Sequence, residues 1–143
     1  MSRHCGGTVH GANTAAAVRT MVDAVNSGDF AGAIAAFTEA PVIIEDLAPY
    51  LWRGADAPSN WLSAMGANAA RLNVQSVLMA VEQPNRVEVD AQVAYAVIPG
   101  ELRLAGEGGD VSAKGVLTLT LQCVCGRWLI DALVWSGPEP APH

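Results

Sequence analysis

The chain has 143 residues, of which 51% are hydrophobic and 15% are charged, and its formal net charge is -6. A chain of this length forms one domain whose core needs no metal or disulfide, and its apolar content argues against disorder. The Lys and Arg residues are scattered, which argues against a nucleic-acid partner. No apolar run is long enough to span a bilayer and no signal peptide is recognised, so we expect a cytoplasmic protein with no membrane partner.

The chain has three cysteines, Cys5, Cys123 and Cys125. A small and odd number of cysteines does not predict a disulfide framework. The pair Cys123 and Cys125 can bind a metal or react with oxidants, but two small buried side chains on a strand are the favoured interpretation. The histidines lie at the two ends of the chain and do not form a metal-site pattern. We therefore expect neither a cofactor nor a metal.

Two helices are predicted at the beginning of the chain. Asn13 or Thr14 can cap the first, whose apolar residues keep helical spacing until Gly28 ends it. Asp29 can cap a second, short helix. The apolar stripes are Val18, Met21, Val22 and Val25 in the first helix, and Phe30, Ala33, Ile34 and Phe37 in the second.

A short strand over Val42 to Asp46 is expected next, followed by a loop over Pro49 to Gly54. A third helix can start at Asp56, Pro58 or Ser59. Its predicted buried stripe contains Trp61, Leu62 and Met65.

Beyond Asn68 the apolar period changes to two, which predicts strands. One strand is expected across residues 87–97 with its apolar side chains at odd positions, another across 116–123, and a last one across 127–136. Turns are predicted at Pro84-Asn85 and at Gly106 to Asp110. Helices followed by an antiparallel meander predict an α+β fold with the helices on one face of a curved sheet. We expect a flexible N-terminus over 1–13, a single domain over 14–137 and a Pro-rich tail over 138–143.

The order of these elements resembles the nuclear-transport-factor-2-like (cystatin-like cone) superfamily, which includes ketosteroid isomerases and SnoaL-like polyketide cyclases. The resemblance covers nearly the whole chain from about Thr14. It rests on Ala24-Val-Asn-Ser-Gly-Asp29, Ala33-Ile-Ala-Ala-Phe37, Val42-Ile-Ile-Glu-Asp46, Arg53-Gly54 and Gly126-Arg-Trp-Leu-Ile-Asp131. It implies a sheet that wraps around the N-terminal helices and leaves an apolar pocket at its open end.

The resemblance also implies a catalytic base. In ketosteroid isomerases the Glu-Asp pair that ends the strand after the second helix supplies the base through its Asp, which corresponds to Asp46 here. A carboxylate that faces an apolar cavity is partly desolvated, which suits it to moving a proton to or from carbon. Glu45, its neighbour, is expected to face solvent or to brace a strand.

Two departures argue against ketosteroid isomerization. Isomerases of the family hold the enolate oxygen with a Tyr on the first helix, where this chain has Met21, and with a protonated Asp on a late strand, where residues 115–120 contain no acid. Loss of one such donor commonly costs a few kcal/mol in the barrier.

Asp131 is a second catalytic candidate, since cyclases of the SnoaL type place their acid–base Asp near the last strands. Simple alternation puts it on one face with Leu129, Leu133 and Trp135. The favoured alternative is an ion pair with Arg53, Arg103 or Arg127 at the sheet rim or at a dimer interface.

The candidate ligand-binding residues are mostly aromatic. Tyr50 and Trp52 can roof the pocket mouth or pin the loop that contains them, and Tyr95 can hydrogen-bond to a ligand or lie half-buried on the sheet. Trp61 and Met21 can line the pocket or fill it as core residues.

Two functions are therefore open. The first is an isomerase, cyclase or dehydratase that acts on a small hydrophobic molecule by carboxylate acid–base chemistry. The second is a non-catalytic ligand-binding or dimerisation module of the same fold. The resemblance also implies a homodimer, which would cover the exposed face of the sheet.

Overall fold

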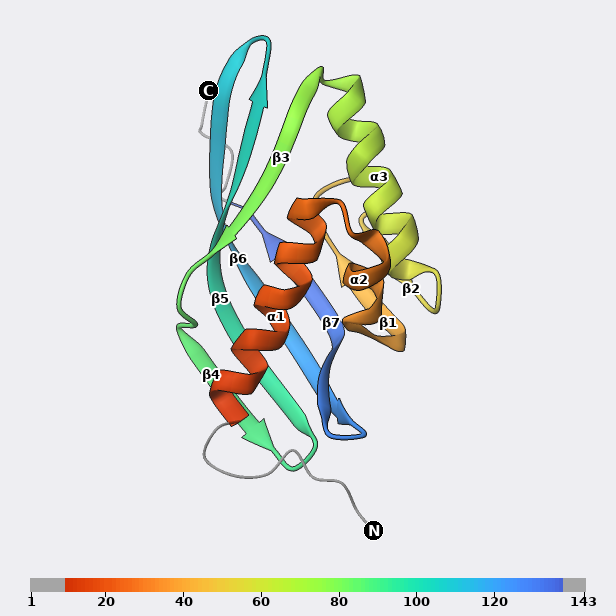
Figure 1. Ribbon diagram of the computed structural model, residues 1–143, viewed down its shortest axis with the longest axis vertical. Helices are drawn as coiled ribbons and strands as arrows, with labels where there is room; N and C mark the ends of the chain where they lie inside the picture. The colour runs from red at the N-terminus through yellow and green to blue at the C-terminus, as the bar shows by residue number, and fades with distance from the viewer. Residues whose placement is uncertain (1–9, 138–143) are drawn as a thin grey trace.

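The computed structural model describes residues 10–137, where three helices lie on one face of a seven-stranded sheet (Figure 1). The helices are α1 (His10–Ser27), α2 (Phe30–Ala35) and α3 (Ala57–Arg71). The strands are β1 (Phe37–Ile44), β2 (Leu51–Arg53), β3 (Val74–Val81), β4 (Arg86–Asp90), β5 (Val93–Gly106), β6 (Gly109–Val124) and β7 (Arg127–Ser136).

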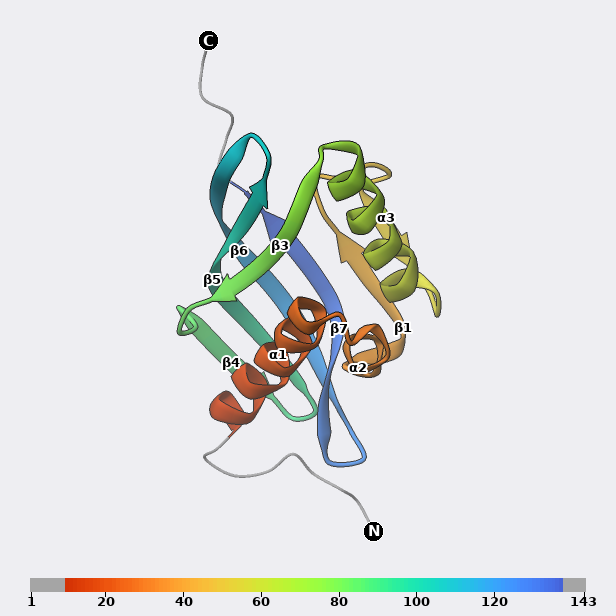
Figure 2. The ribbon, with the colours of Figure 1, turned by 45° about the horizontal axis from the view of Figure 1, so that its top comes forward.

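The sheet has the order β2-β1-β7-β6-β5-β3, and β4 also pairs with β5. All neighbouring strands are antiparallel except β1 and β7, which are parallel. Strands β3 and β4 pair with successive parts of β5, and Pro99 lies between these parts, where its missing N–H leaves no donor for either strand. The sheet curves around α1 and α2, as the turned view shows (Figure 2).

The core lies between the helices and the concave face of the sheet. In β6 the buried residues are Leu117, Leu119 and Leu121, which alternate with partly exposed polar residues, so only one face of this strand is apolar. The matching inward residues of β5 are Ala94, Ala96 and Ile98. From the helices the core receives Val18, Met21, Val22, Ala33, Trp61 and Leu62.

Two paired glycines make room for Trp135 on the concave face. Gly100 and Gly115 are opposite each other in the β5–β6 ladder. A Cβ atom on Gly115 would lie 2.5 Å from Cζ2 of Trp135, and one on Gly100 would lie 3.3 Å from its Cζ3. The buried indole therefore covers this pair and fills that part of the concave face, so a larger side chain at Gly115 cannot be accommodated without movement.

The α+β class and the helix pair are confirmed, but β1 starts earlier than predicted. Phe37, expected on the second helix, begins β1, and Val42 lies in its middle. Phe37 pairs with Ile130 of the parallel strand β7, and this pairing extends β1 toward the N-terminus. The predicted loop over 49–54 contains a short strand, β2, in which Trp52 pairs with Ile43.

The single strand predicted across residues 87–97 is wrong. The chain turns at Ala91, whose φ is 55°, and forms a β4–β5 hairpin in which Val89 pairs with Ala94. The turn inverts the alternation, because the buried residues of β5 are at even positions. The sequence Asp90-Ala-Gln-Val93 contains no Gly or Asn that would have predicted this turn.

The two ends of the chain lie partly outside the described residues. Residues 10–13 of the expected flexible N-terminus belong to α1, while residues 1–9 and the tail 138–143 lie outside the described residues.

The prediction of two small buried cysteines is wrong, since Cys125 is exposed in the β6–β7 turn and Cys123 is disulfide-bonded. In the described part of the chain no helix is long and apolar enough to cross a membrane.

We predict that Gly115→Ala lowers the free energy of unfolding by about 1–3 kcal/mol, because the new methyl group overlaps Trp135 and the carbonyl oxygen of Ser136. Gly108→Ala is the matched control, since nothing lies within 4 Å of a Cβ atom there. Urea denaturation of both variants measures the difference. Equal unfolding free energies for the two would show that Trp135 does not need the glycine.

Candidate functional site

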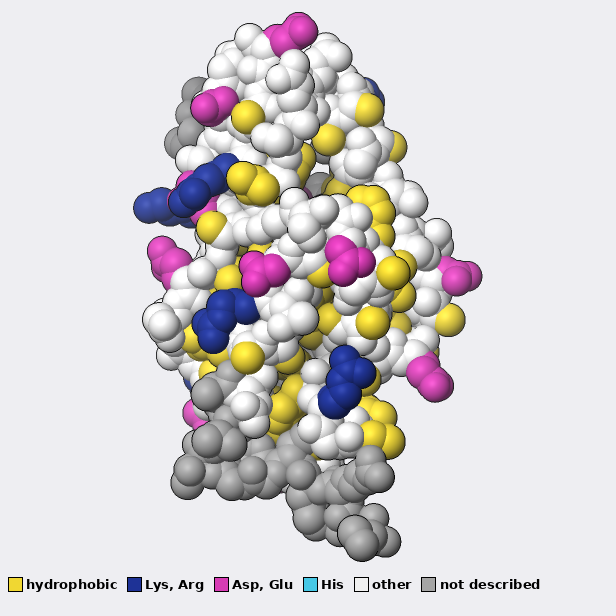
Figure 3. All heavy atoms as spheres, in the orientation of Figure 1, with side chains coloured by type: hydrophobic (Ala, Val, Ile, Leu, Met, Phe, Trp, Pro, Cys, Tyr) yellow, Lys and Arg dark blue, Asp and Glu magenta, His cyan; other side chains and the backbone are white. Residues whose placement is uncertain are grey.

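A cavity lies between α3 and the strands β3 and β5, and we call it the α3 cavity. It consists of two adjoining lobes that share Met65, Ala69, Val77 and Leu102. The strand register determines which sheet residues line the cavity. Val77 pairs with Leu104 and Met79 pairs with Leu102, and these side chains are on the face of the sheet that is turned toward α3. Hydrophobic side chains are visible along the line where the helices approach β3 (Figure 3).

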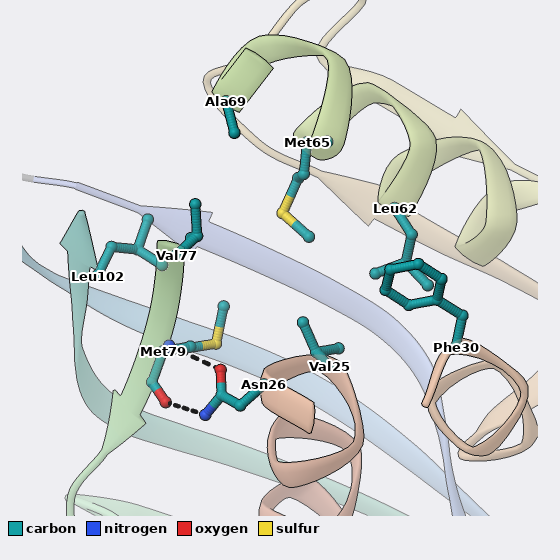
Figure 4. Close-up of a pocket in the computed structure, with 10 residues that line it drawn as sticks. Val25, Asn26, Phe30, Leu62, Met65, Ala69, Val77, Met79 and Leu102 are labelled. Atoms are coloured by element: carbon teal, nitrogen blue, oxygen red, sulfur yellow. Dashed lines mark hydrogen bonds between the residues drawn. The ribbon is translucent and has the colours of Figure 1, made fainter. Parts of the chain in front are cut away.

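The first lobe, which we call the apolar lobe, has a volume of about 170 Å³. Figure 4 shows Leu62 and Met65 of α3 and Met79 of β3 projecting into the same space. Asn26 closes one side, since its side chain donates to the carbonyl oxygen of Met79 at 2.8 Å and accepts from the N–H of Met79 at 2.9 Å. The amide is satisfied by these two bonds, so the lobe offers little polarity to a ligand.

The second lobe, the acidic lobe, has a volume of about 130 Å³. It adjoins the end of β1 and holds the polar side chains of Glu45, Asp46 and Asn68. Its remaining lining is apolar and comprises Leu47, Met65, Ala69, Leu72, Val74, Val77, Leu102 and Leu104.

The end of β1 positions the two acids. Glu45 follows Ile43 by two residues, so both side chains point to the concave face. The N–H of Glu45 donates to the carbonyl oxygen of Tyr50 at 3.2 Å, and the N–H of Tyr50 donates to Leu47 at 2.8 Å. These bonds close a tight loop in which Tyr50 has a φ of 74°. The loop therefore fixes the backbone of Glu45 where the strand ends.

Glu45 is a buried carboxyl group at the wall of the cavity. It is 6% exposed, and burial raises its pKa from 4.5 to about 7. The indole of Trp61 opposes the rise and the charge of Asp46 adds to it. The contact with Trp61 is weaker than a full hydrogen bond, because Nε1 of Trp61 is buried without a partner at hydrogen-bonding geometry. The group is therefore divided between its acid and its base form near neutral pH.

Trp61 holds α3 over this site. It is fully buried, and its ring meets Phe37 of β1 edge-on with 6.3 Å between the centroids. One turn later Met65 enters both lobes, and Asn68 reaches the acidic lobe. Asn68 is oriented by Arg71, whose Nη2 donates to its Oδ1 at 2.6 Å.

The structure reverses the expected orientation of the Glu-Asp pair. Asp46 was expected to face the apolar interior and Glu45 the solvent, but Asp46 is exposed and Glu45 is buried. The alternation from Ile43 accounts for the reversal. Asp46 still lines the acidic lobe, so its role as a base stays a prediction.

Asp131 lies away from the α3 cavity. The β6–β7 ladder pairs Leu121 with Ile130 and Thr120 with Ala132, which leaves Asp131 in a β-bulge. Its carboxylate accepts from Thr38 Oγ1 at 2.8 Å and from Gln122 Nε2 at 3.3 Å, and not from the arginines considered in the sequence. The bulge also changes the alternation, so that Ile130 and Leu133 are both buried and the face predicted for Asp131 is wrong.

The other predicted ligand residues do not come together. Met21 and Trp52 are buried in the core and Trp61 contacts Glu45, while none of the three lines either lobe. Tyr50 is 60% exposed. Tyr95 is on the opposite face of the sheet, where the guanidinium of Arg86 lies 5.4 Å from its ring centroid.

The sequence contained a signal for the residues that were missed. Asn68 follows Trp61 by seven residues and Met65 by three, so it is a polar residue on the apolar stripe of α3. Glu45 likewise shares its face with Ile43. Within residues 10–137 no three His, Cys, Asp or Glu side chains lie close enough to hold a metal ion. The arrangement can bind an apolar molecule and exchange a proton with it through Glu45.

We predict that the stability of the protein falls between pH 4.5 and pH 7 because of Glu45. The unfolded state ionises this group near its ordinary pKa of 4.5, whereas the folded state keeps the proton until about pH 7. Folding therefore binds a proton in this interval, and stability decreases as pH rises through it by roughly 3 kcal/mol at most.

The pH dependence of Glu45→Gln provides the comparison. Unfolding free energies of both proteins are measured by urea denaturation from pH 4 to pH 8.5, and the difference between them isolates Glu45. We expect the unfolding free energy of Glu45→Gln to increase relative to that of the wild type as pH rises. A constant difference would contradict the raised pKa.

Known proteins resemble this chain in fold. No family model matches the sequence, and no curated protein is significantly similar to it. A candidate scytalone dehydratase from Novosphingobium aromaticivorans has a TM-score of 0.77 at 13% identity, and the match covers 92% of this chain and 85% of that one. A ketosteroid isomerase-like protein from Erwinia carotovora atroseptica has a TM-score of 0.70 at 19% identity, with 94% of this chain and 100% of that chain covered.

A protein of unknown function from Nostoc punctiforme, with a cystatin-like fold, has a TM-score of 0.67 at 8% identity over 99% of this chain and 98% of its own. These TM-scores establish a shared fold, and the low sequence identities leave activity open. The chain therefore has the cystatin-like cone fold of nuclear-transport-factor-2-like proteins, as the order of its elements predicts.

Proposed function

We propose that the protein binds a small hydrophobic molecule in the α3 cavity and transfers a proton to or from it through Glu45, as an isomerase, a cyclase or a dehydratase does. The observation that carries the proposal is a buried carboxyl group, with a pKa raised to about 7, in the wall of a mostly apolar cavity. A general acid–base group works best when its pKa lies near the pH at which it operates. Because the side chain itself carries the proton, this step needs no cofactor.

The size of the cavity limits the ligand. A cavity of about 150 Å³ lined by apolar side chains is large enough to hold benzene. The apolar lobe, at about 170 Å³, therefore suits one six-membered ring, and the acidic lobe, at about 130 Å³, suits a second ring or a short substituent. A molecule of one or two rings fills both lobes and reaches Glu45 with its polar end.

The structural relatives support this class of chemistry without fixing the reaction. Among them are proteins described as a candidate scytalone dehydratase and as ketosteroid isomerase-like. The reaction of this chain must nevertheless use its own groups, since Met21 occupies the helix position where the isomerases carry a Tyr and is fully buried. A homodimer remains part of the proposal on the resemblance alone.

The test is proton exchange at carbon with a simple probe. The full-length protein is incubated in D₂O with 2-tetralone, a two-ring ketone whose protons beside the carbonyl exchange slowly in buffer, and deuterium uptake is followed by NMR. We expect the wild type to accelerate exchange at least about 100-fold over buffer, the range of general acid–base catalysis, and Glu45→Gln to abolish the acceleration.

Two further variants identify the group responsible. Glu39→Gln removes an exposed acid of β1, the strand that ends just before Glu45, and is expected to exchange as fast as the wild type. Asp46→Asn keeps Glu45 and should also remain active. Loss of exchange in Asp46→Asn with full activity in Glu45→Gln would transfer the role to Asp46. Binding of 2-tetralone without any exchange would favour a non-catalytic ligand-binding module.

A further inference from the structure

We propose that Asn68 is the hydrogen-bond donor that holds a carbonyl oxygen of the substrate, so that the α3 cavity takes small one- or two-ring ketones. This inference rests on the proposed function and adds to it a substrate class and a second functional residue. The ketosteroid isomerases, which this chain resembles in the order of its elements, use donors that it lacks, and Asn68 lies on a different element, α3.

Arg71 fixes which end of the Asn68 amide faces the cavity. A guanidinium group can only donate hydrogen bonds, so its partner in the amide must be the oxygen. Arg71 Nη2 donates to Oδ1 of Asn68 at 2.6 Å in an exposed part of α3, and this bond turns the oxygen toward Arg71. The NH₂ group of Asn68 is then left to donate to another acceptor. Arg71 is thus a positioning residue for the donor.

Asn68 and Glu45 line the same lobe from different elements. Asn68 extends from α3, and Glu45 follows the last residue of β1. Apart from Asp46, every other residue that lines this lobe has an apolar side chain. A carboxylate can only accept hydrogen bonds, so the amide of Asn68 is the natural donor for a substrate oxygen when Glu45 acts as a base. The ring system of the ketone then extends toward Met65 and the apolar lobe.

The reaction that this geometry allows is enolisation. The Glu45 carboxylate takes a proton from the carbon next to the carbonyl, the C–H electron pair forms a C=C bond, and the carbonyl π electrons move to the oxygen. The Asn68 N–H bond to this oxygen strengthens as negative charge develops there. Glu45, now protonated, returns the proton to the same carbon or to another one. No oxidant, reductant or further reactant is required.

The experiment measures binding separately from turnover. 2-Tetralone labelled with ¹³C at the carbonyl is bound to the wild type, and tetralin, which lacks the oxygen, serves as the reference ligand. We expect a downfield shift of the carbonyl resonance on binding, which reports a hydrogen bond to the oxygen. In Asn68→Leu this shift is lost, the affinity for 2-tetralone falls roughly 3- to 10-fold, and the affinity for tetralin does not fall.

Asn68→Asp tests hydrogen-bond donation by residue 68 separately from its structural contact with Arg71. The aspartate keeps a bond to Arg71 but has no N–H to offer, so we expect kcat for deuterium exchange to fall about 100-fold at pH 9, where Glu45 is ionised. Arg71→Leu should lower kcat less, and Arg71→Lys should restore part of the loss. Asn60→Leu, which replaces an exposed asparagine on the same helix, is the matched control.

The possible failures can be told apart. If the wild type binds 2-tetralone but does not catalyse exchange, the proposed function fails, while the carbonyl shift still tests Asn68. If exchange depends on Glu45 but Asn68→Asp and Asn68→Leu retain the wild-type kcat and carbonyl shift, the inference about Asn68 is overturned and the proposed function stands.

Discussion

The burial of the Glu45 carboxyl group determines what this structure can do. An ionised carboxylate in an apolar environment without a partner is strongly disfavoured, so such a group keeps its proton at a higher pH than usual. Around Glu45 the compensation is small. Trp61 offers only a weak contact, and Asp46 adds a repulsive charge instead of a partner. The fold therefore accepts a cost in stability at neutral pH, and unrelieved costs of this kind are concentrated at functional sites.

The same packing that buries Glu45 leaves the space beside it. Trp61 and Phe37 hold the beginning of α3 against β1, whereas the later part of the helix presents Gly66 and Ala69 toward β3. Short side chains at these positions cannot reach Val77 and Leu102, so a cavity remains between helix and sheet. Elsewhere the concave face is filled, as the Trp135 indole over Gly100 and Gly115 shows. The acidic lobe of this cavity adjoins the carboxyl group of Glu45.

Much of the fold could be predicted from the sequence, because its signals are local. The apolar stripes with Gly28 and Asp29 between them predicted the helix pair, and the alternation after Asn68 predicted the strands. Features set by pairing with distant strands could not be predicted in this way. β1 extends back to Phe37 because β7 lies beside it, and the bulge at Asp131 inverts the alternation along β7.

The site was harder to predict for a related reason. Alternation placed Glu45 and Asp46 on opposite faces, but only the packing of α3 shows which face is the interior. The resemblance favoured Asp46, whereas Glu45 is the buried member of the pair. Aromatic side chains also misled the choice, since Tyr50 and Tyr95 are large and polar at one end yet are exposed or on the opposite face. Asn68 was missed because one polar residue on an apolar stripe is a weak signal without its partner Arg71.

The proton affinity of Glu45 can be measured directly by ¹³C NMR of its side-chain carboxyl carbon in protein labelled at glutamate, with Glu45→Gln used to assign the resonance. We predict a titration midpoint near pH 7 for Glu45, well above the ordinary glutamate value of 4.5. A midpoint close to 4.5 would mean that water reaches this carboxylate freely, and the proposed chemistry would then lose its base.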